Sequence, residues 1–426
     1  MKRLFILLAV CCIIVICIFA YQSFQDRNTL SGHRVVLCIP VYGQSLALGE
    51  EAVRITDFDS LRIKYNGRIM TECLDYGFGY CEGTILKQRI KKVIRYKKRV
   101  YELSLYKMAE ELALELEEDT VICIFPGGLA ASPLDSMNKG KDAYKKFLYE
   151  VELAYNKSKD RGWQFYIPAI CWMQGETDIT DDQPGYDYKQ KLKQFWTDIN
   201  HDIKKITNQR VDVHMIVYQA NALTNSESFR QNNYNCKETT IPQSFVDLIN
   251  EDSLFWASGP TYPYHCVNEI VHIDGIGQQH IGKLEAKAAL RIIRGENKTY
   301  GLTPYYLYKE DHDIIIQFHV PHPPLVFDTI SISPINHYGF SVITEEGQNI
   351  LSDVSIEGNH VRLRCFQSPT NCKVRYAVNG EYMKSGPEHG PRGNLRDSQG
   401  NKETFSIQGK VYPLHNWCYQ FDMLCK

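Results

Sequence analysis

The stretch RVVLCIPVYGQSLALGE, residues 34–50, passes from an apolar segment into a glycine and a serine. Residues 34–40 are almost continuously apolar, which is typical of a strand buried on both faces of a sheet. Ser45 follows this segment closely. A serine in such a place is more often a turn or capping residue than a nucleophile, so its role depends on what the rest of the chain supplies.

Three further apolar segments repeat the pattern, and helical periodicity separates them. They are TVICIF (120–125), FYIPAICWM (165–173) and VDVHMIVY (211–218). Helices are expected around 100–116, over 185–206 and over roughly 275–293, where apolar residues recur at helical spacing. Strands that alternate with helices indicate a parallel sheet covered on both faces. Residues 33–298 are therefore predicted to form a doubly wound, three-layer α/β domain.

After residue 303 the sequence pattern becomes strand-like. HVRLRCF (360–366) alternates strictly, and DIIIQFHV (313–320), TISIS (329–333) and KVRYAV (373–378) are also strand-like. Turn signals separate these segments. Residues 304–426 are predicted to form an all-β module of the sandwich type, which supports the first domain or contacts sugars.

The N-terminus suggests export. Lys2 and Arg3 precede an apolar run over residues 4–21, and a short linker (22–32) follows. The run is long enough to span a membrane, and the basic residues on its N-terminal side favour translocation of the rest. The chain is expected at the cell surface, in a periplasm or outside the cell. A retained membrane anchor and a cleaved signal peptide both remain open.

The charge and the cysteines narrow the classes of ligand. The 426 residues carry a formal net charge of −2, so no basic surface favours a nucleic acid partner. The 14 cysteines show no spacing typical of a zinc site, and neither a metal nor another cofactor is predicted. Four pairs could form disulfides in an oxidising compartment: Cys73/Cys81, Cys236/Cys266, Cys365/Cys372 and Cys418/Cys425.

Polar blocks follow the predicted parallel strands. They are GQS with Ser45, PGG (126–128), WMQGETD (172–178) and, later, NEIVHIDGIGQQHIG (268–282). In doubly wound sheets the carboxyl ends of the strands meet at one edge, where ligands bind. These four blocks are therefore expected to lie close together.

The blocks and their order resemble the SGNH/GDSL-type hydrolases, and within them the sialate O-acetylesterase-like carbohydrate esterases. WMQGETD is the most specific match, and Gly277 and Gly282 fit the glycine spacing that follows the histidine of the last block. The resemblance covers roughly residues 33–295. It implies a flavodoxin-like α/β/α fold and a serine esterase.

The resemblance also implies roles for three residues. Ser45 would be the nucleophile, His272 its general base, and Glu269 the acid that orients the histidine. The family usually has aspartate at the position of Glu269. Asp274 is the competing acid, although an aspartate just before a helix is also a favoured N-cap.

An esterase must also stabilise the oxyanion that forms during acyl transfer. The backbone N–H groups of Ser45 and Gly128 and the side-chain amide of Gln174 are the predicted donors, and the Thr177 hydroxyl is the alternative to Gln174. One further departure from the family lies beside the nucleophile. Leu46 stands where related esterases carry asparagine, and this change is expected to alter the pocket wall or the support of Ser45.

These observations predict a serine esterase that removes O-acetyl groups from carbohydrate through an acyl-enzyme, with sialic acid or xylan among the candidate sugars. Two alternatives stay open. One is a non-catalytic, carbohydrate-binding surface protein on a degenerate esterase fold. The other is an O-acyltransferase that uses the same residues.

Overall fold

The computed structural model describes residues 34–70, 101–181, 184–224 and 240–425. The N-terminal apolar run and Cys73, Cys81 and Cys236 lie outside these ranges. Among the helices of the described ranges, none is both long and apolar enough to cross a bilayer.

The first part of the chain builds a parallel sheet system from the predicted apolar segments. β1 (Val35–Cys38), β3 (Ile69–Met70), β4 (Thr120–Cys123) and β6 (Gln164–Tyr166) form a sheet in the order β3-β4-β1-β6. A second sheet has the order β5-β2-β7-β8-β9. Its strands are β2 (Val41–Gly43), β5 (Pro126–Gly128), β7 (Ala169–Met173), β8 (His214–Gln219) and β9 (Phe255–Pro260). The chain passes directly from β1 to β2, β4 to β5 and β6 to β7, so the two sheets follow one another.

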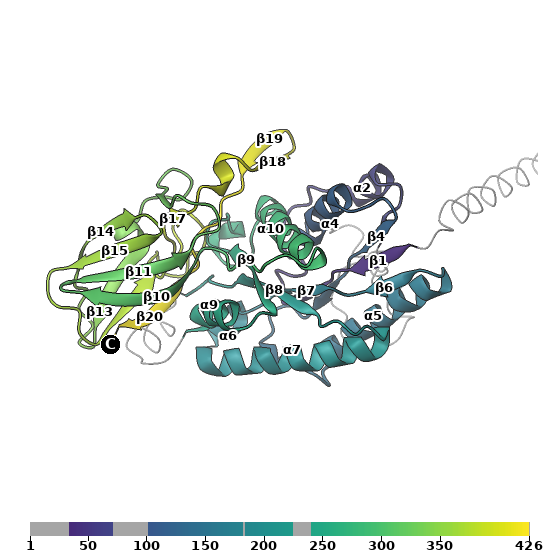
Figure 1. Cartoon of the computed structure of the whole chain (residues 1–426), viewed down its shortest axis with the longest axis horizontal. Helices are drawn as coiled ribbons and strands as arrows, with labels where there is room; N and C mark the ends of the chain where they lie inside the picture. Colours follow the sequence, from purple (N-terminus) through teal and green to yellow (C-terminus); the bar gives the residue numbers. More distant parts are fainter. Residues whose placement is uncertain (1–33, 71–100, 182–183, 225–239, 426) are drawn as a thin grey trace, which may run out of the picture.

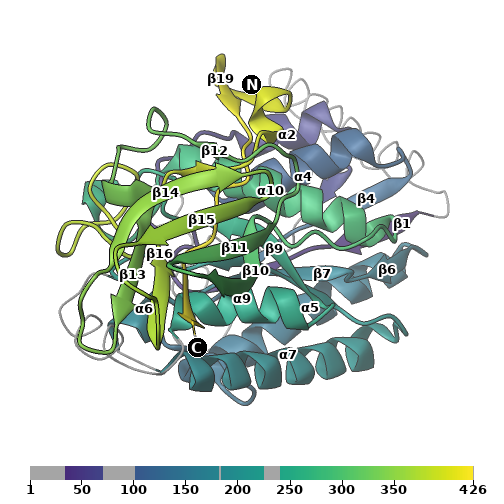
Figure 2. The ribbon, with the colours of Figure 1, turned by 60° about the vertical axis from the view of Figure 1, so that its left-hand side comes forward.

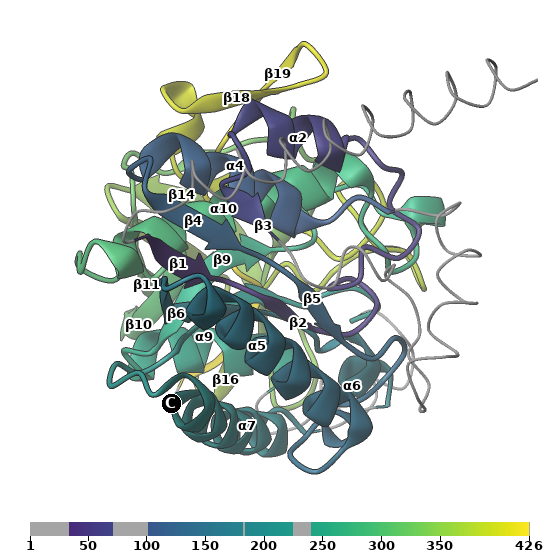
Figure 3. The same cartoon turned by 90° about the vertical axis from the view of Figure 1, so that its right-hand side faces the viewer.

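Helices lie on both sides of these strands (Figures 1 and 3). On one side are α2 (Phe58–Lys64), α4 (Ser104–Glu115) and α10 (Gly275–Ile293), and on the other are α5 (Asp142–Asp160), α6 (Glu176–Thr180), α7 (Gly185–Thr207) and α9 (Ile241–Glu251). The predicted mixed α/β architecture with a parallel sheet is confirmed. β9 was missed because its sequence FWASGP ends in residues typical of a turn.

Aromatic side chains join the sheet to the helices below it. Tyr42 on β2 stacks on Phe195 of α7 with ring centroids 5.4 Å apart, and meets Phe147 of α5 edge-on at 4.8 Å. Trp172 on β7 is fully buried beside the same Phe195 at 4.8 Å. This packing fixes the strand ends from which the polar blocks emerge.

The rest of the chain is largely antiparallel (Figure 2). One sheet has the order β10-β11-β15-β14, with β10 (Thr303–Glu310), β11 (Asp313–His319), β14 (Leu351–Glu357) and β15 (His360–Cys365). Another contains β13 (Phe340–Thr344), β16 (Cys372–Tyr376) and β20 (Phe421–Cys425). Two shorter pairs are β12 (Val326–Phe327) with β17 (Leu395–Arg396), and β18 (Thr404–Ile407) with β19 (Lys410–Pro413).

Two local predictions for this β module are wrong. TISIS (329–333) is not a strand, because the Asp328 carboxylate accepts hydrogen bonds from the N–H groups of Ile330 and Ser331 and turns the backbone there. The described cysteines are all free thiols, so the pairs Cys365/Cys372 and Cys418/Cys425 are not bridged. Cys372 instead lies opposite Cys425 across β16 and β20.

The β module is joined to the α/β part by buried polar contacts. Gln219, at the end of β8, exchanges hydrogen bonds with the backbone of Gln420, at 2.8 and 2.7 Å. Tyr262, just after β9, donates to the Cys418 carbonyl at 2.7 Å. Thr240 donates to Asp422 at 2.7 Å. Buried polar groups must find such partners, so these bonds fix the module against the carboxyl ends of β8 and β9.

Candidate active site

Ser45 lies in a tight turn directly after β2. Its carbonyl accepts hydrogen bonds from the N–H groups of Leu48 and Glu50, at 3.1 and 3.0 Å, so the chain folds back on itself after the serine. Gly49 adopts a left-handed backbone with φ of 63°, and a Cβ there would lie 2.1 Å from the Glu102 carbonyl oxygen. Only glycine fits this turn without displacing its neighbours. Ser45 itself is 4% exposed.

His272 comes from the segment between β9 and α10 and meets the serine. Its Nε2 lies 2.8 Å from the Ser45 Oγ, which is the distance of a hydrogen bond. The structure therefore brings together the two residues that the sequence paired across more than two hundred positions. A neutral imidazole with a free Nε2 lone pair at this place can accept the proton of the hydroxyl.

The other ring nitrogen of His272 is bound by a residue that the sequence analysis did not name. The Glu51 Oε2 lies 2.7 Å from His272 Nδ1, and the Glu51 side chain is 49% exposed. Glu51 is the last residue of the turn that follows Ser45, and its left-handed φ of 64° directs the backbone back toward the histidine. Serine, histidine and glutamate thus form a continuous hydrogen-bonded chain, the arrangement used by serine hydrolases.

The prediction that Glu269 orients His272 is wrong for this structure. The Glu269 carboxylate points instead to the β module, where Oε2 lies 2.6 Å from Lys384 Nζ and Oε1 lies 2.6 Å from His389 Nδ1. The hydrogen bond from Lys384, followed by that from His389, lowers the pKa of Glu269. Left-handed backbones at Asn268 and Glu269 turn the segment so that positions 269 and 272 face different ways.

The competing acid, Asp274, caps a helix. Its Oδ1 accepts a hydrogen bond from Gly277 N–H at 2.7 Å at the start of α10, and burial raises its pKa. This is the N-cap role that aspartate commonly takes. Asp274 lies two residues after His272, and its cap fixes the first turn of α10. Asp274 therefore supports the position of the histidine without contacting it.

The predicted role of Gln174 as an oxyanion donor is also contradicted. The side chain is fully buried, its Nε2 donates to the Ser132 carbonyl at 3.3 Å and to Asp178, and its Oε1 accepts from Tyr188 at 2.8 Å. A buried amide with all these groups engaged has no donor left for a substrate. The pair formed by Gln174 and Asp178 shapes the loop after β7, and Asp178 also accepts from Leu134 N–H at 3.0 Å.

The remaining predicted donors stay compatible with an oxyanion site. Ser45 N–H has no hydrogen-bond partner among the described residues. Gly128 ends β5 beside Gly43, so close that a Cβ would lie 1.7 Å from the Gly43 carbonyl oxygen. Thr177 is linked to the serine turn, because its N–H donates to the side chain of Gln44 at 3.3 Å.

Of the two consequences expected of Leu46, the structure shows support of the serine turn and not a pocket wall. It is 1% exposed and belongs to the hydrophobic core, and its carbonyl accepts from the side chain of Gln278 at 3.0 Å. The residue that replaces the family's asparagine therefore anchors the serine turn to α10 from below.

Sequence reasoning missed Glu51 because the histidine block already contained two carboxylates. Its signal was present: two adjacent acids, Glu50 and Glu51, follow GQS after a glycine in a segment too short to form a helix. What the sequence could not show was the direction of the turn. That direction depends on Glu102, which is fully buried and accepts hydrogen bonds from the N–H groups of Ile55 and Thr56 at 2.7 and 2.8 Å.

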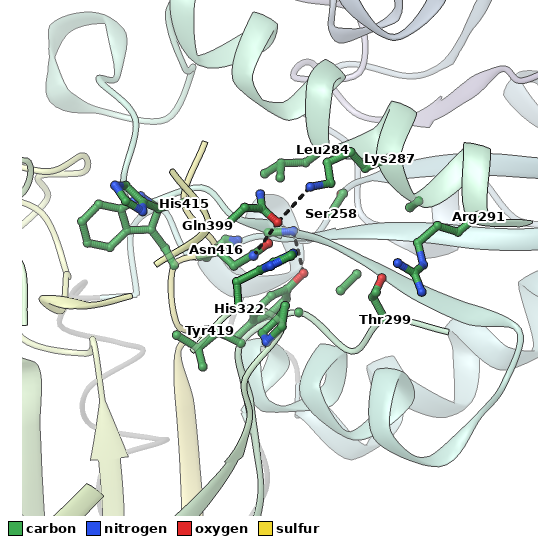
Figure 4. Close-up of a pocket in the computed structure, with 18 of the residues that line it drawn as sticks. Ser258, Leu284, Lys287, Arg291, Thr299, His322, Gln399, His415, Asn416 and Tyr419 are labelled. Carbon is green, nitrogen blue, oxygen red and sulfur yellow. Dashed lines mark hydrogen bonds between the residues drawn. The ribbon is translucent and has the colours of Figure 1, made fainter. Parts of the chain in front are cut away.

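A separate cavity of about 80 Å³ lies between the second half of α10, the end of β9 and the β module (Figure 4). Its lining includes Ser258, Lys287, His322, Asn416 and Tyr419, but not Ser45, Glu51 or His272. Lys287 Nζ donates hydrogen bonds to Gln399 Oε1 at 2.8 Å and to Glu403 Oε2 at 2.5 Å. This cavity belongs to the junction between the two parts of the chain and not to the serine site.

Part of the chain matches a known family of esterases. Residues 95–291 match the family described as carbohydrate esterase, sialic acid-specific acetylesterase. That range holds WMQGETD and His272 but begins after Ser45 and Glu51. No curated protein matches the chain.

Several solved structures are similar to this chain. A crystal structure described as a novel carbohydrate acetylesterase from Xanthomonas citri aligns with a TM-score of 0.54 and 13% identity, over 92% of this chain and 80% of its own. The structure of NanS aligns at 0.42 and 12%, over 62% and 99%, and a protein from Arabidopsis thaliana aligns at 0.40 and 15%, over 60% and 98%. At such identities the first likeness shows a shared fold that extends into the β module. Residues 95–291 are therefore similar to the sialic acid-specific carbohydrate acetylesterases, and the chain is a carboxylic ester hydrolase.

Proposed function

We propose that this protein removes O-acetyl groups from carbohydrate, with Ser45 as nucleophile, His272 as general base and acid, and Glu51 as the orienting carboxylate. One observation supports this assignment above all others. A chain of hydrogen bonds at 2.8 and 2.7 Å joins Ser45 Oγ, both nitrogens of His272 and the Glu51 carboxylate. The fold follows the strand order of flavodoxin-like sheets, with β2 between β5 and β7 and with β8 and β9 beyond β7, which supports the three-layer arrangement expected for this class.

The reaction follows from these contacts. His272 Nε2 takes the proton of the Ser45 hydroxyl while Oγ attacks the acetyl carbonyl carbon, and the imidazolium that forms is stabilised by Glu51 through Nδ1–H. The tetrahedral oxyanion collapses, His272 returns the proton to the sugar oxygen, and the alcohol leaves an acetyl-serine. Water, deprotonated by His272, then attacks this ester and releases acetate and the free serine.

The oxyanion needs donors that are already in place. Ser45 N–H and Gly128 N–H are the proposed backbone donors, and the Thr177 hydroxyl takes the place that was expected for Gln174. Each such donor contributes roughly 3 kcal/mol of transition-state stabilisation in comparable esterases and proteases. The family description favours O-acetylated sialic acid as the substrate. Export to the cell surface, through the apolar run at residues 4–21, would place the enzyme where such glycans occur.

Acetate release tests this proposal. The purified full-length chain is expected to hydrolyse p-nitrophenyl acetate and O-acetylated sialic acid, and to be labelled at Ser45 by a fluorophosphonate. Ser45→Ala should abolish turnover and labelling while the melting temperature stays unchanged. Undiminished turnover by Ser45→Ala would overturn the proposal. Labelling without release of acetate from any acetylated glycan would favour the glycan-binding alternative, and acetyl transfer to an added sugar in preference to water would favour the transferase.

A further inference from the structure

The segment that carries His272 is a small hairpin, residues 266–273, which we call the histidine hairpin. Cys266 and Ile273 form an antiparallel bridge at its base, and Val267 N–H donates to the His272 carbonyl at 2.7 Å. Glu269 lies at its tip, where its N–H donates to the Cys266 carbonyl at 2.9 Å. A displacement of the tip is therefore transmitted to His272 through three residues of backbone.

The tip of the hairpin has little apolar packing of its own. None of the residues 267–269 is buried, and the next side chain, Ile270, is 49% exposed. Asn268 and Glu269 both adopt left-handed backbones, with φ of 54° and 57°. Segments with few buried contacts open at low cost in free energy, so the position of this tip depends on polar contacts with its surroundings.

Those contacts come from the β module. Lys384 Nζ and His389 Nδ1 each lie 2.6 Å from a different oxygen of the Glu269 carboxylate. Ser385 N–H donates to the Glu269 carbonyl at 2.8 Å. A carboxylate oxygen of Glu388 lies within 4.8 Å of the Glu269 carboxylate and of a ring nitrogen of His389. Side chain and backbone of Glu269 are thus both held by one short segment, residues 384–389.

This segment is itself fixed in place. The Ser385 hydroxyl accepts a hydrogen bond from Leu223 N–H at 3.3 Å, and Gly390 N–H donates to the Gly386 carbonyl at 3.1 Å. Gly386 lies against the start of the hairpin, where a Cβ would lie 3.3 Å from the Tyr264 carbonyl oxygen. The β module, joined to β8 and β9 by buried hydrogen bonds, therefore provides a fixed support for the hairpin tip.

We propose that Lys384 and His389 are positioning residues of the esterase: by holding Glu269 they keep His272 in register with Ser45 and Glu51. This inference rests on the proposed function. The glutamate at the family's usual acid position ties the histidine hairpin to the β module, and the acid that contacts the imidazole comes from the serine turn.

Loss of the contacts between Glu269 and the β module should lower the catalytic rate more than the stability of the fold. Lys384, His389 and Glu269 side chains are 39%, 43% and 35% exposed, and ion pairs in such places contribute little to the free energy of unfolding. A misplacement of about 1 Å between catalytic groups, by contrast, costs up to about a hundredfold in rate. Loss of the contact should therefore lower kcat and leave KM and the melting temperature nearly unchanged.

The test compares variants of the full-length chain. Glu269→Gln, Lys384→Met and His389→Ala are each expected to lower kcat by roughly tenfold, with KM within about twofold of the parent. The double variant Glu269→Gln/Lys384→Met should lose no more kcat than either single variant, because both changes remove the same contact. Lys384→Arg should retain most of the activity. Glu357→Gln is the matched control, because Glu357 binds Arg362 at 2.6 Å on β15 of the same module; it should leave kcat unchanged.

The outcomes separate this inference from the proposed function. If Ser45→Ala is inactive while Glu269→Gln, Lys384→Met and His389→Ala keep the parent kcat, the esterase assignment stands and the positioning role is overturned. A fall in kcat that is matched by a large fall in melting temperature, or that also occurs in Glu357→Gln, would likewise overturn it. If Ser45→Ala retains activity, the proposed function itself fails.

Discussion

The serine turn and the histidine hairpin each carry a glutamate, and the two are held by opposite means. In the serine turn, Glu51 is positioned from within the α/β part by a tight glycine turn and by the buried carboxylate of Glu102, which binds the following backbone. In the hairpin, Glu269 is held from outside by the β module. The comparison teaches that nearness in sequence to the histidine does not select its partner. The direction of the backbone turn does.

Removal of the histidine shared by both regions should have the largest effect. His272→Ala deletes the group that accepts the serine proton, and kcat for acetate release is expected to fall by roughly 10³-fold, within the range found for general bases. Steady-state rates with p-nitrophenyl acetate measure this. A loss of less than tenfold would show that Ser45 is not activated by His272. Neither glutamate could then act on the reaction through this histidine.

A pH-dependent change in stability is expected from Glu176, next to the loop that contacts the serine turn. Burial raises the pKa of Glu176 to about 7, and Tyr218 donates to this carboxyl at 2.5 Å. Because the folded state holds the proton more tightly than the unfolded chain, stability falls as pH rises from about 4.5 to about 7. A shift of this size corresponds to about 3 kcal/mol.

Glu176→Gln should remove that loss. Denaturant unfolding at pH 4 is expected to give nearly equal free energies for the variant and the parent, and at pH 8 the variant should be more stable by up to about 3 kcal/mol. Equal stability at both values would show that Glu176 ionises without cost in the fold. The kcat of the variant at pH 8 should stay near that of the parent, since Glu176 contacts neither Ser45 nor His272.

Gly49→Ala weakens the serine turn alone and should have a smaller effect. A Cβ at this left-handed position meets the Glu102 carbonyl oxygen at 2.1 Å, so the turn must shift, at a cost of about 2 kcal/mol in unfolding free energy. Gly67→Ala is the matched control, because Gly67 has φ of 70° but open space around its Cβ position. The difference between the two variants isolates the clash, and kcat should fall only in Gly49→Ala. Equal kcat values would mean that the turn does not determine the position of Glu51.

Much of the fold could be predicted from sequence because buried parallel strands are continuously apolar and the helices are amphipathic. The helix at 275–293 and the helix that starts at 185 appear where the periodicity indicated. Strand β9 and the segment 329–333 were misjudged because local composition did not reflect the environment: FWASGP is buried despite its turn residues, and Asp328 diverts an apparently strand-like segment.

The site could be predicted only where chemistry and motif coincide. Ser45 and His272 were found because each lies in a characteristic block, and the sheet brings those blocks together. Glu269 and Gln174 were misassigned, and Glu51 was missed, because their roles depend on which way a side chain points. Gln174 faces inward because Asp178 of its own block and Tyr188 of α7 bind its amide. Glu269 faces outward because Lys384 and His389 of the β module bind its carboxylate, and these partners lie far from the histidine block in the sequence.

The central claim, that Glu51 and not Glu269 orients His272, is tested most directly by comparing Glu51→Gln with Glu269→Gln. The measurement is kcat/KM for acetate release by the full-length chain, with the melting temperature of each variant as a check on folding. We expect Glu51→Gln to lose roughly 10²-fold and Glu269→Gln roughly tenfold, since the first removes the carboxylate that stabilises the imidazolium and the second only loosens the hairpin. A larger loss in Glu269→Gln than in Glu51→Gln would contradict this account.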